Sequence, residues 1–466
     1  MKRILLIEPP SPERLGAPLL GLQSLAASLL DGGHEVAVVD AAAREHHPTA
    51  EEIVRQAEAM RPDIIGVALF TRWVWHAYQL VPHLRGLAPL LVAGGPHATA
   101  RPLEPLSRGF DVVVTGEAEQ AMRAVAAASD REDFARIPGI WYRGNGGALA
   151  PGPPASPLED LDRLPHPLHA QHLFDSRWYQ TGSQDIIPGG VLTSRGCPAR
   201  CTFCANYVTG RRFRFRSAAH VVDELNAYNQ RFGLTFFPFW DDAFTADSKR
   251  LMELCAAFES DLRFPIQWSA ITRANMVTPA LLAAMKRAGC VSVNFGVESG
   301  DDGILRVIKK GVATRHVVQA LEWSKALGLT TACNFMLGFP QDTPATLHNT
   351  LRFMESIAPM VDSFSTLGVA VPFPGTPLYE DFHFQYGFSD WWLRESYSHY
   401  TAYPPISDFD RFYRHYIDDA NLELDFFRYS SCVRDAIREA LRYKAEHNLR
   451  RMGLLRDPVY RPIPAA

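Results

Sequence analysis

Three cysteines near the middle of the chain are spaced closely enough to hold a metal centre together. Cys197, Cys201 and Cys204 form the pattern C-x3-C-x2-C, and the remaining cysteines are scattered without a C-x2-C pair. Thiolates are soft ligands that suit iron–sulfur clusters, zinc or copper(I). A [4Fe–4S] cluster normally has four cysteine ligands, so three cysteines leave one iron open to a small molecule. A zinc site with a distant fourth ligand, or chance clustering, is the alternative, although no second cysteine pair of the kind that structural zinc sites use is present.

The cysteine motif resembles that of the radical S-adenosylmethionine (SAM) enzymes. Phe203 stands just before the last cysteine, where the superfamily usually has an aromatic residue, and Gly196-Cys197-Pro198 resembles the start of the motif in a large subgroup. The resemblance implies that the open iron holds the amino and carboxylate groups of SAM, with Phe203 among the SAM-binding residues. It does not identify the substrate.

The composition indicates a folded protein with more than one domain. The chain has 466 residues, of which 47% are hydrophobic, and this is enough for two or three domains. A formal net charge of −4 does not favour binding to nucleic acid or to an anionic membrane. No apolar run approaches the ~20 residues of a membrane span. An odd number of cysteines with unpaired spacing argues against a secreted disulfide framework, so we expect a cytoplasmic protein.

Residues 1–145 predict a doubly wound, Rossmann-like α/β domain. Apolar, β-branched runs alternate with segments of helical spacing, which requires right-handed crossovers and a parallel sheet. The expected strands are 2–7, 35–39, 63–69, 90–93 and 111–114. Ligands of such sheets bind beyond the carboxyl ends of the strands. A nicotinamide cofactor is excluded, because Glu8-Pro9-Pro10 follows the first strand where G-x-G-x-x-G is needed.

Two motifs in this region resemble the cobalamin-binding domain of class B radical SAM enzymes. Gly94-Gly95-Pro96-His97 follows the fourth expected strand, and Gly116-Glu117-Ala118-Glu119 follows the fifth. Class B enzymes carry this domain ahead of the cysteine motif, as here, and the resemblance covers nearly the whole chain except its C-terminal end. The resemblance implies these cobalamin-binding residues: Pro10, Thr71, Arg72, Trp73, Gly94, Gly95, Pro96, His97, Gly116 and Glu117.

One departure from the wider cobalamin family concerns the cobalt ligand. The string D-x-H-x-x-G, whose histidine ligates cobalt, is absent from the sequence. By resemblance, cobalamin binds with its own base displaced and no histidine below the cobalt. Residues 70–75 would then lie under the lower face, with Arg72, Trp73 or Trp75 in the axial space, and core packing is an equal alternative for either tryptophan. We expect His97 to be a hydrogen-bonding loop residue rather than a metal ligand.

The central part of the chain predicts a partial barrel. After an expected linker at 146–188, rich in glycine, proline and alanine, residues 189–384 repeat a strand–helix pattern six times. Six units are fewer than the eight of a closed barrel. The count fits the partial (β/α)6 barrel of the radical SAM superfamily, whose site faces the carboxyl ends of the strands.

Three charged residues at those strand ends are candidates for SAM binding. Asp242 resembles the family residue that receives the SAM amino group; an acid–base pair with Asp241, or a helix N-cap, is the alternative. Arg273 could hold a carboxylate as a charge-assisted fork, or be a surface charge. Glu298 lies in G-V-E-S-G, which resembles the family's G-x-E-S-G, where the glutamate accepts hydrogen bonds from ribose hydroxyls.

The C-terminal residues 385–466 are rich in aromatic side chains and predict a small helical cap, with helices at 408–417 and 432–448. We interpret this cap as closing the barrel mouth and lining the substrate pocket, with ordinary packing as the alternative for each aromatic. The basic segment 211–216 is a loop beside the cluster that could contact an anionic substrate or an electron donor; the net charge argues against a nucleic-acid patch.

These observations predict a cobalamin-dependent radical SAM enzyme of α/β class. By resemblance, the reduced cluster cleaves SAM to a radical that removes hydrogen from an unactivated carbon of the substrate. We favour C-methylation of a small-molecule, lipid or tetrapyrrole-like substrate, with cyclisation or ring rearrangement as the alternative and a non-catalytic cobalamin carrier or sensor as a third possibility. The expected partners are the substrate and an electron donor such as flavodoxin or ferredoxin, without nucleic acid.

Overall fold

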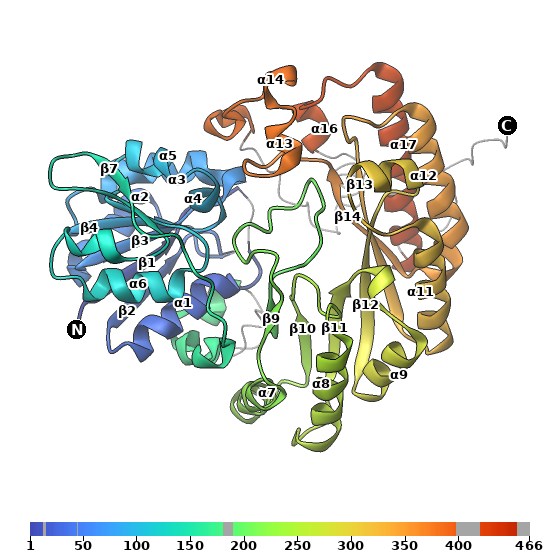
Figure 1. Ribbon diagram of the computed structural model, residues 1–466, viewed down its shortest axis with the longest axis horizontal. Helices are drawn as coiled ribbons and strands as arrows, with labels where there is room; N and C mark the ends of the chain where they lie inside the picture. Colours follow the sequence, from blue (N-terminus) through green and yellow to red (C-terminus); the bar gives the residue numbers. More distant parts are fainter. Residues whose placement is uncertain (13–14, 44, 180–189, 398–419, 454–466) are drawn as a thin grey trace.

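The computed structural model describes residues 1–466 except 13–14, 44, 180–189, 398–419 and 454–466. Figure 1 shows two α/β lobes side by side, the N-terminal lobe in blue to teal and the second lobe in green to red. A green segment that precedes β9 (Arg214–Phe215) lies between the two lobes. This segment contains the three clustered cysteines, so residues of both lobes can contact it.

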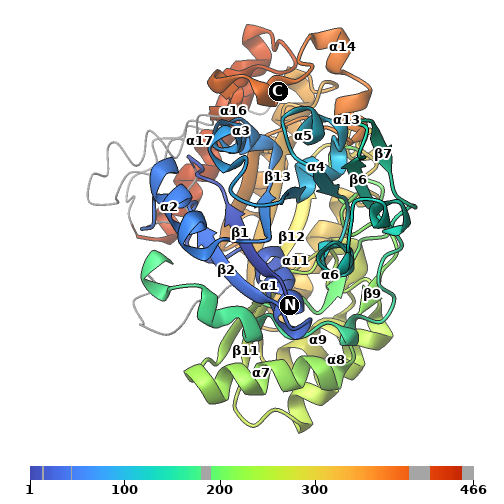
Figure 2. The ribbon, with the colours of Figure 1, turned by 90° about the vertical axis from the view of Figure 1, so that its left-hand side faces the viewer.

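The N-terminal lobe is the doubly wound sheet that the alternation of strands and helices predicts. The strand order is β2-β1-β3-β4-β5-β6-β7, with the first five of these strands parallel. The parallel strands are β1 (Arg3–Glu8), β2 (Glu35–Asp40), β3 (Ile64–Ala68), β4 (Leu90–Gly94) and β5 (Val112–Val114). The helices are α1 (Leu20–Asp31), α2 (Ala50–Met60), α3 (Val74–Leu84), α4 (Pro96–Ala100), α5 (Leu103–Ser107) and α6 (Ala118–Ala127). Figure 2 shows α2 and α6 on opposite sides of this lobe. Helices on both faces bury the strands, which explains their nearly continuous apolar runs.

An antiparallel hairpin continues this sheet beyond the parallel strands. β6 (Ile140–Arg143) pairs with β5, and β7 (Leu149–Pro151) pairs with β6. The sheet therefore runs past residue 145, where we expected the domain to end. The domain limits themselves stay a prediction.

The second lobe has a parallel sheet with the order β10-β11-β12-β13-β14. Its strands are β10 (Phe236–Phe239), β11 (Gln267–Thr272), β12 (Cys290–Glu298), β13 (Thr330–Leu337) and β14 (Ser363–Val369). Its main helices are α7 (Ala218–Phe232), α8 (Ser248–Ser260), α9 (Pro279–Arg287), α10 (Asp302–Val307), α11 (Thr314–Ala326) and α12 (Pro344–Ile357). The first of the six repeats predicts a strand at residues 191–193, just before the cysteine motif; within the described residues this segment forms only an isolated bridge between Val191 and Phe239. The result is an open sheet, as a partial barrel requires.

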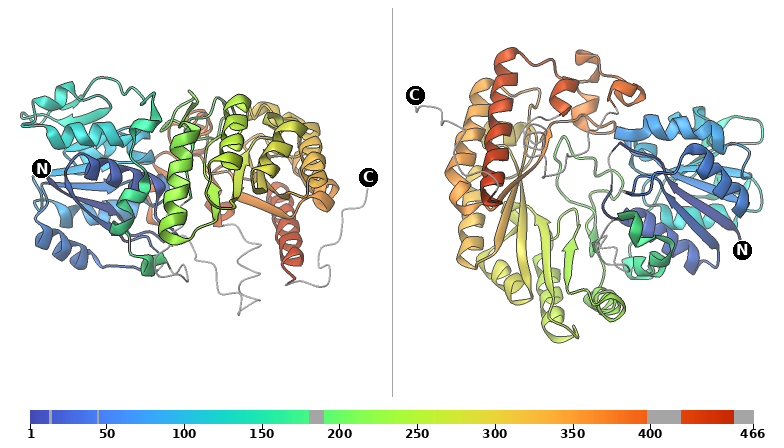
Figure 3. Two further views of the ribbon diagram at one scale, coloured as in Figure 1. Left: turned by 90° about the horizontal axis from the view of Figure 1, so that it is seen from below. Right: turned by 180° about the vertical axis from the view of Figure 1, so that it is seen from behind.

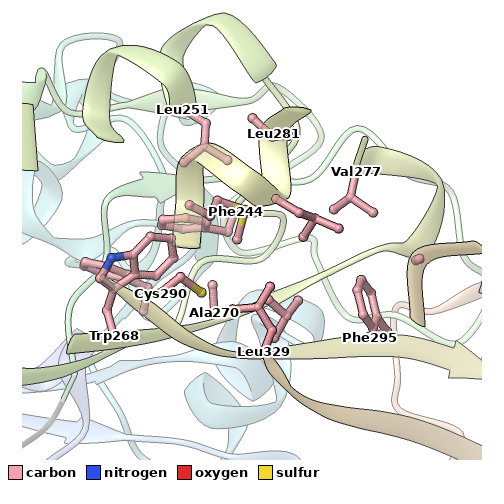
Figure 4. Packing of buried hydrophobic residues seen from close by; sticks show 14 of the residues in the cluster. Phe244, Leu251, Trp268, Ala270, Val277, Leu281, Cys290, Phe295 and Leu329 are labelled. Carbon is pink, nitrogen blue, oxygen red and sulfur yellow. The ribbon is translucent and has the colours of Figure 1, made fainter. Parts of the chain in front are cut away.

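Aromatic residues fill the core between this sheet and its outer helices. The rings of Phe244 and Trp268 lie 5.3 Å apart between centroids, and Figure 4 shows Leu251, Leu281 and Cys290 around them. The Trp268 Nε1 donates a hydrogen bond of 2.7 Å to a backbone carbonyl, so the buried indole keeps its polar partner. This rigid core positions the carboxyl ends of the strands, where the candidate SAM residues lie.

The described C-terminal aromatics pack as core residues. Trp391 and Trp392 are each 1% exposed and belong to a hydrophobic cluster shared with the N-terminal lobe. Packing, the alternative that we kept for them, therefore describes both tryptophans, and the expected helix at 408–417 lies outside the described residues. α17 (Ser431–Arg451) packs against α12 and β14, and is the long red helix on the outside of the lobe in Figure 3.

The described C-terminal part also contains three short α-helices, α13 (Pro377–Glu380), α14 (His383–Tyr386) and α16 (Ala420–Leu424), and two 3-10 turns, Trp391–Leu393 and Glu395–Tyr397. Across the described ranges, no helix combines the length and the hydrophobicity that crossing a membrane requires.

Candidate functional site

The three cysteines lie in a loop of residues 196–213, called the cysteine loop below. Its two ends are joined by β8 (Ser194–Arg195) and β9, an antiparallel pair in which Arg195 lies opposite Arg214. Gly196 has a φ of +90°, and a Cβ there would lie 2.2 Å from a backbone oxygen of the same loop, so the first turn requires glycine. The Cys197 amide donates to the Gly210 carbonyl at 3.2 Å. The loop therefore folds back on itself and brings the cysteines together.

The cysteine side chains sit close to one another and to a guanidinium group. Burial raises the pKa of Cys204, and together with the neighbouring Cys201 and Cys197 it brings this pKa to about 12. The Arg273 Nη1 donates to the Cys201 Sγ at 3.3 Å. Adjacent thiolates need a positive centre to neutralise them, so this donor set fits an iron–sulfur cluster. Within the described ranges, no three aspartate, glutamate, histidine or cysteine side chains are placed to bind one metal ion. An iron–sulfur cluster does not require such a site, because each of its cysteines binds a different iron.

Arg273 and Phe203 both lie beside the cysteines, as the sequence predicts. The buried Arg273 Nε has no hydrogen-bond partner among the described residues, which leaves a donor available for an anionic group. Phe203 packs against Phe339 at 5.7 Å between ring centroids. Their roles in SAM binding stay predictions, supported by this proximity to the cluster ligands.

Glu298 ends β12 with an unusual backbone conformation and a buried ion pair. Its φ is +73°, a region that costs a non-glycine residue free energy and is often found at ligand sites. Its Oε1 accepts a 2.6 Å hydrogen bond from the Lys310 Nζ, and both side chains are less than a tenth exposed. A Cβ on Gly296 would lie 2.8 Å from that Nζ, so the glycine leaves room for the pair. The sequence indicated Glu298 as a SAM-binding residue, and Lys310-Gly311 also resembles a recurrent position of the family, but no pairing between Glu298 and Lys310 was predicted.

Replacing Glu298 with alanine should weaken SAM binding while the cluster is kept. Hydrogen bonds to a charged group contribute ~1.5–3 kcal/mol, so we expect roughly a tenfold to hundredfold loss of SAM affinity. Equilibrium dialysis with SAM and iron analysis measure the two properties separately. Glu253→Ala, at an exposed surface position, is the control. Unchanged SAM affinity in the Glu298 variant would make this residue a structural one.

The two neighbouring aspartates after β10 have different surroundings. Asp241 is buried and accepts hydrogen bonds from the Thr193 amide and hydroxyl, at 3.2 and 2.7 Å, and from Ser194. Burial raises the pKa of Asp241, which the attraction of Arg250 opposes. Asp242 is exposed, borders the cavity described next, and accepts from the Gly196 amide at 3.2 Å and the Thr209 hydroxyl at 2.8 Å. These contacts favour Asp242 over Asp241 as the residue that faces a ligand.

A cavity of about 420 Å³ lies between the carboxyl edge of the N-terminal sheet and the cysteine loop. Five of the residues predicted to bind cobalamin line it: Gly94, Gly95, Pro96, Gly116 and Glu117. A Cβ on Gly94 would meet no atom within 4 Å, so the backbone there opens directly into the cavity. The remaining lining is mostly apolar, and a large apolar space bounded by glycine backbone fits a bulky cofactor such as cobalamin.

The other predicted cobalamin residues do not line this cavity, and two of them have clear alternative contacts. His97 is completely buried; its Nδ1 is 3.1 Å from the Thr71 hydroxyl and its Nε2 is 3.2 Å from a Glu104 carboxylate oxygen. His97 is therefore a hydrogen-bonding residue, as we expected for it, and Thr71 supports its ring. Pro10, Arg72 and Trp73 also lie outside the lining, and their contact with cobalamin stays a prediction.

Several residues that line the cavity were not predicted from the sequence, because they belong to no motif. Gly66, in the middle of β3, and Leu19, before α1, look like ordinary fold residues. Trp240 follows β10, lines the cavity and is 52% exposed. A glycine inside an apolar strand was the available indication for Gly66, because such a residue marks a close approach of a ligand or backbone.

Glu117, at the border of the cavity, forms ion pairs with both arginines at the ends of the cysteine loop. The Arg214 Nη1 donates to it at 3.0 Å, and the Arg195 Nη1 is 3.3 Å away. Glu119 pairs with the Arg195 Nη2 at 2.6 Å. These contacts give Glu117 a structural role toward the cysteine loop that the sequence did not indicate, and its contact with cobalamin stays a prediction.

The Glu119–Arg195 pair predicts a stability change at acid pH. Burial alone would raise the pKa of Glu119, but attraction and hydrogen bonding by Arg195 lower it to about 2 from 4.5. A lowered folded-state pKa stabilises the protein above pH 4.5, and this stability is lost as the pH falls toward 2. When the pH is lowered from 5 to 3, the free energy of unfolding of the cofactor-free protein, measured with urea, should fall by about 2 kcal/mol more in wild type than in Glu119→Gln. An equal loss in both proteins would contradict the pair's contribution.

Comparisons with known proteins identify the family. The family model of the radical SAM superfamily matches residues 191–354, and that of the B12 binding domain matches residues 16–126. An uncharacterized methyltransferase of Pyrococcus horikoshii is 31% identical over 391 residues, covering 81% of this chain and 82% of that protein. The anaerobic magnesium-protoporphyrin IX monomethyl ester cyclase of Rubrivivax gelatinosus is 26% identical and covers 77% of this chain and 65% of that protein.

A solved structure has the same overall fold. The radical SAM methyltransferase TsrM from Kitasatospora setae matches with a TM-score of 0.66 and 22% identity, covering 84% of this chain and 77% of that one. The two domain matches, in this order along the chain, agree with the two lobes and with the cavity between them. The chain therefore belongs to the cobalamin-dependent radical SAM enzymes, whose cofactors are a [4Fe–4S] cluster, SAM and cobalamin.

Proposed function

We propose that this enzyme transfers a methyl group to an unactivated carbon of a small-molecule, lipid or tetrapyrrole-like substrate. The observation that carries the proposal is the shared cavity, which glycines of the cobalamin-binding lobe and residues of the cysteine loop border together. One space that touches both cofactor sites suits a reaction in which a methyl carrier and a radical source act on the same carbon. The methyltransferase relative, at 31% identity, adds support.

The chain's own residues have positioning roles in this proposal. When bound, the cofactors supply the methyl group and the hydrogen-abstracting radical; the protein orients them and excludes water. Cys197, Cys201 and Cys204 would hold the cluster. Arg273 would bind the SAM carboxylate, and Asp242 its amino group. Glu298, set by the Lys310 ion pair, would accept hydrogen bonds from the ribose hydroxyls of SAM.

Cyclisation without net methyl transfer is the second candidate, which the cyclase relative at 26% identity favours. The substrate class comes from the mostly apolar cavity and stays part of the proposal. An electron donor such as flavodoxin or ferredoxin, and a cytoplasmic location, likewise remain predictions.

The two candidate reactions differ in the products formed from SAM. A methyltransferase of this type consumes two SAM molecules per turnover, giving S-adenosylhomocysteine and 5′-deoxyadenosine in equal amounts. A cyclase gives 5′-deoxyadenosine without matching S-adenosylhomocysteine. Both products can be quantified by mass spectrometry with methyl-deuterated SAM, in slow turnover without added substrate. Formation of 5′-deoxyadenosine alone by the cobalamin-loaded enzyme would rule out methyl transfer and favour the cyclase.

A further inference from the structure

A buried group of four charged residues joins the cobalamin-binding lobe to the two ends of the cysteine loop. Glu117 is the N-cap of α6 and Glu119 lies in its first turn. Arg195 and Arg214 face each other across the β8–β9 pair, where the cysteine loop begins and ends. These four residues are called the clamp below. Glu117 contacts both arginines, so one carboxylate of the first lobe bridges the two ends of the loop that carries the cluster ligands.

Hydrogen bonds join the clamp residues to one another and to their surroundings, although the buried Arg214 Nε has no partner among the described residues. The Glu119 Oε1 accepts from the Arg195 Nη2 at 2.6 Å and from the Ser24 hydroxyl at 2.7 Å. The Arg214 guanidinium also donates to the Thr209 carbonyl, within the cysteine loop, at 3.0 Å. Two carboxylates and two guanidinium groups balance in charge. Each charge therefore has a partner of the opposite sign, as buried ionic groups require.

Burial separates the clamp from ordinary surface pairs of the same loop. The side chains of Arg214, Glu119, Glu117 and Arg195 are 2%, 8%, 11% and 13% exposed. Arg212, in the same loop, pairs at 2.6 Å with Glu159, but these side chains are 71% and 54% exposed. Removing one partner of a buried pair leaves an uncompensated charge, whereas an exposed pair contributes little. Arg212–Glu159 is therefore a matched control.

The clamp also touches the cavity. Glu117, Glu119 and Arg195 all line it, and a Cβ on the neighbouring Gly116 would lie 3.6 Å from the Val208 carbonyl of the cysteine loop. A ligand that orders the carboxyl edge of the first lobe will therefore also restrain the cysteine loop. Within the part of the chain that the structure describes, no hydrogen bond or ion pair joins a clamp side chain to a cysteine sulfur, so any influence on the cluster acts through the position of the loop.

We propose that Glu117 is a positioning residue that fixes the cysteine loop on the cobalamin-binding lobe, and that the clamp couples the occupancy of the two cofactor sites. Because coupling between sites is reciprocal, a loaded cluster strengthens cobalamin binding by the same factor by which cobalamin strengthens cluster binding. The inference requires both cofactor sites but no particular reaction. Coupling between the two sites can be disproved while methyl transfer is confirmed, and methyl transfer can be disproved while the coupling is confirmed.

The test compares cobalamin binding by cluster-free and cluster-loaded full-length protein. Equilibrium dialysis with hydroxocobalamin, under anaerobic conditions, gives a Kd for each form of wild type, Glu117→Gln and Glu159→Gln. In wild type and in Glu159→Gln, loading the cluster should lower the Kd by about tenfold. In Glu117→Gln the two Kd values should be nearly equal. A purely structural defect would instead weaken both forms and keep their ratio, and this outcome would overturn the proposal.

Hydrogen exchange provides a second measurement on wild type, which decides the matter even if Glu117→Gln fails to fold. Hydroxocobalamin added to cluster-free protein should slow amide exchange across residues 196–213, including the Cys197 amide at the start of the loop, as well as around the cavity. Protection that is confined to the cobalamin-binding lobe would overturn the proposal. If Glu117→Gln does fold, it should keep protection in that lobe and lose it in the cysteine loop.

Discussion

Simultaneous replacement of Cys197, Cys201 and Cys204 with alanine is expected to remove all cluster iron from the reconstituted protein. The wild-type chain should hold about four irons, the content of one [4Fe–4S] cluster. The cysteine loop places these three thiols together, and the remaining cysteines in the barrel core, Cys255, Cys290 and Cys333, are buried and cannot replace them. Iron and sulfide analysis after anaerobic reconstitution measures the effect, which we expect to be complete.

The same variant should still bind cobalamin, because none of the three cysteines lines the cavity. Cys432→Ala, at an exposed position, is the control and should keep the full iron content. Zinc in place of iron in the wild type, or retention of the cluster in the triple variant, would contradict the assignment of the cysteine loop as the cluster site.

The fold was largely predictable because its strands carry strong local patterns. Parallel strands that helices bury on both faces must be apolar along their length, and β1, β3 and β4 show such runs in the sequence. The hairpin β6–β7 was missed, since β7 is a short strand with mostly exposed residues and therefore has no hydrophobic pattern. Short edge strands are specified by their pairing partners, which a local pattern does not reveal.

The candidate site was predictable where a motif is contiguous and unpredictable where partners are distant. The spacing of the cysteines and the glycines after β4 indicated the two cofactor sites directly. Glu117 was assigned to cobalamin because Gly116-Glu117-Ala118-Glu119 resembles the motif of class B enzymes; its ion-pair partner Arg214 is 97 positions away along the chain. A carboxylate at a strand end suits a ligand and an ion pair equally well, and an ion-pair partner this distant in the sequence is visible only in the tertiary structure.

The roles of the C-terminal tryptophans were also not predictable from the sequence alone. Large aromatic residues supply core packing and pocket walls with the same side chains, so composition could not separate the two uses. In the structure the Trp391 Nε1 donates to the Pro372 carbonyl at 2.9 Å, and the Trp392 Nε1 donates to Glu104 of the first lobe at 3.0 Å. The Trp392 hydrogen bond therefore links the C-terminal part to the first lobe, and it reaches the same carboxylate that lies beside the His97 Nε2.

Replacing Gly94 with leucine should abolish cobalamin binding without disturbing the fold. Gly94 ends β4 at the cavity, has no positive φ, and a Cβ there would meet nothing within 4 Å. A side chain can therefore begin at this position without a clash, and a leucine there should occupy part of the cavity that Gly94 lines. We expect a loss of cobalamin affinity of at least about a hundredfold, which corresponds to about 2.8 kcal/mol. Equilibrium dialysis with hydroxocobalamin measures the affinity, and thermal unfolding of cofactor-free protein checks the fold.

Two variants decide whether the effect of Gly94→Leu comes from the cavity itself. Gly146→Leu is the matched control, because a Cβ on Gly146 also meets nothing within 4 Å but lies in the exposed turn between β6 and β7; this variant should bind cobalamin as wild type does. Gly95→Ala tests the backbone, since Gly95 has a φ of +97° and a Cβ would lie 2.9 Å from the Leu69 carbonyl oxygen. Gly95→Ala should lower stability as well as affinity, whereas Gly94→Leu should lower affinity alone and keep its cluster iron. Wild-type cobalamin affinity in Gly94→Leu would place the cofactor elsewhere in the molecule, because a filled cavity cannot hold it.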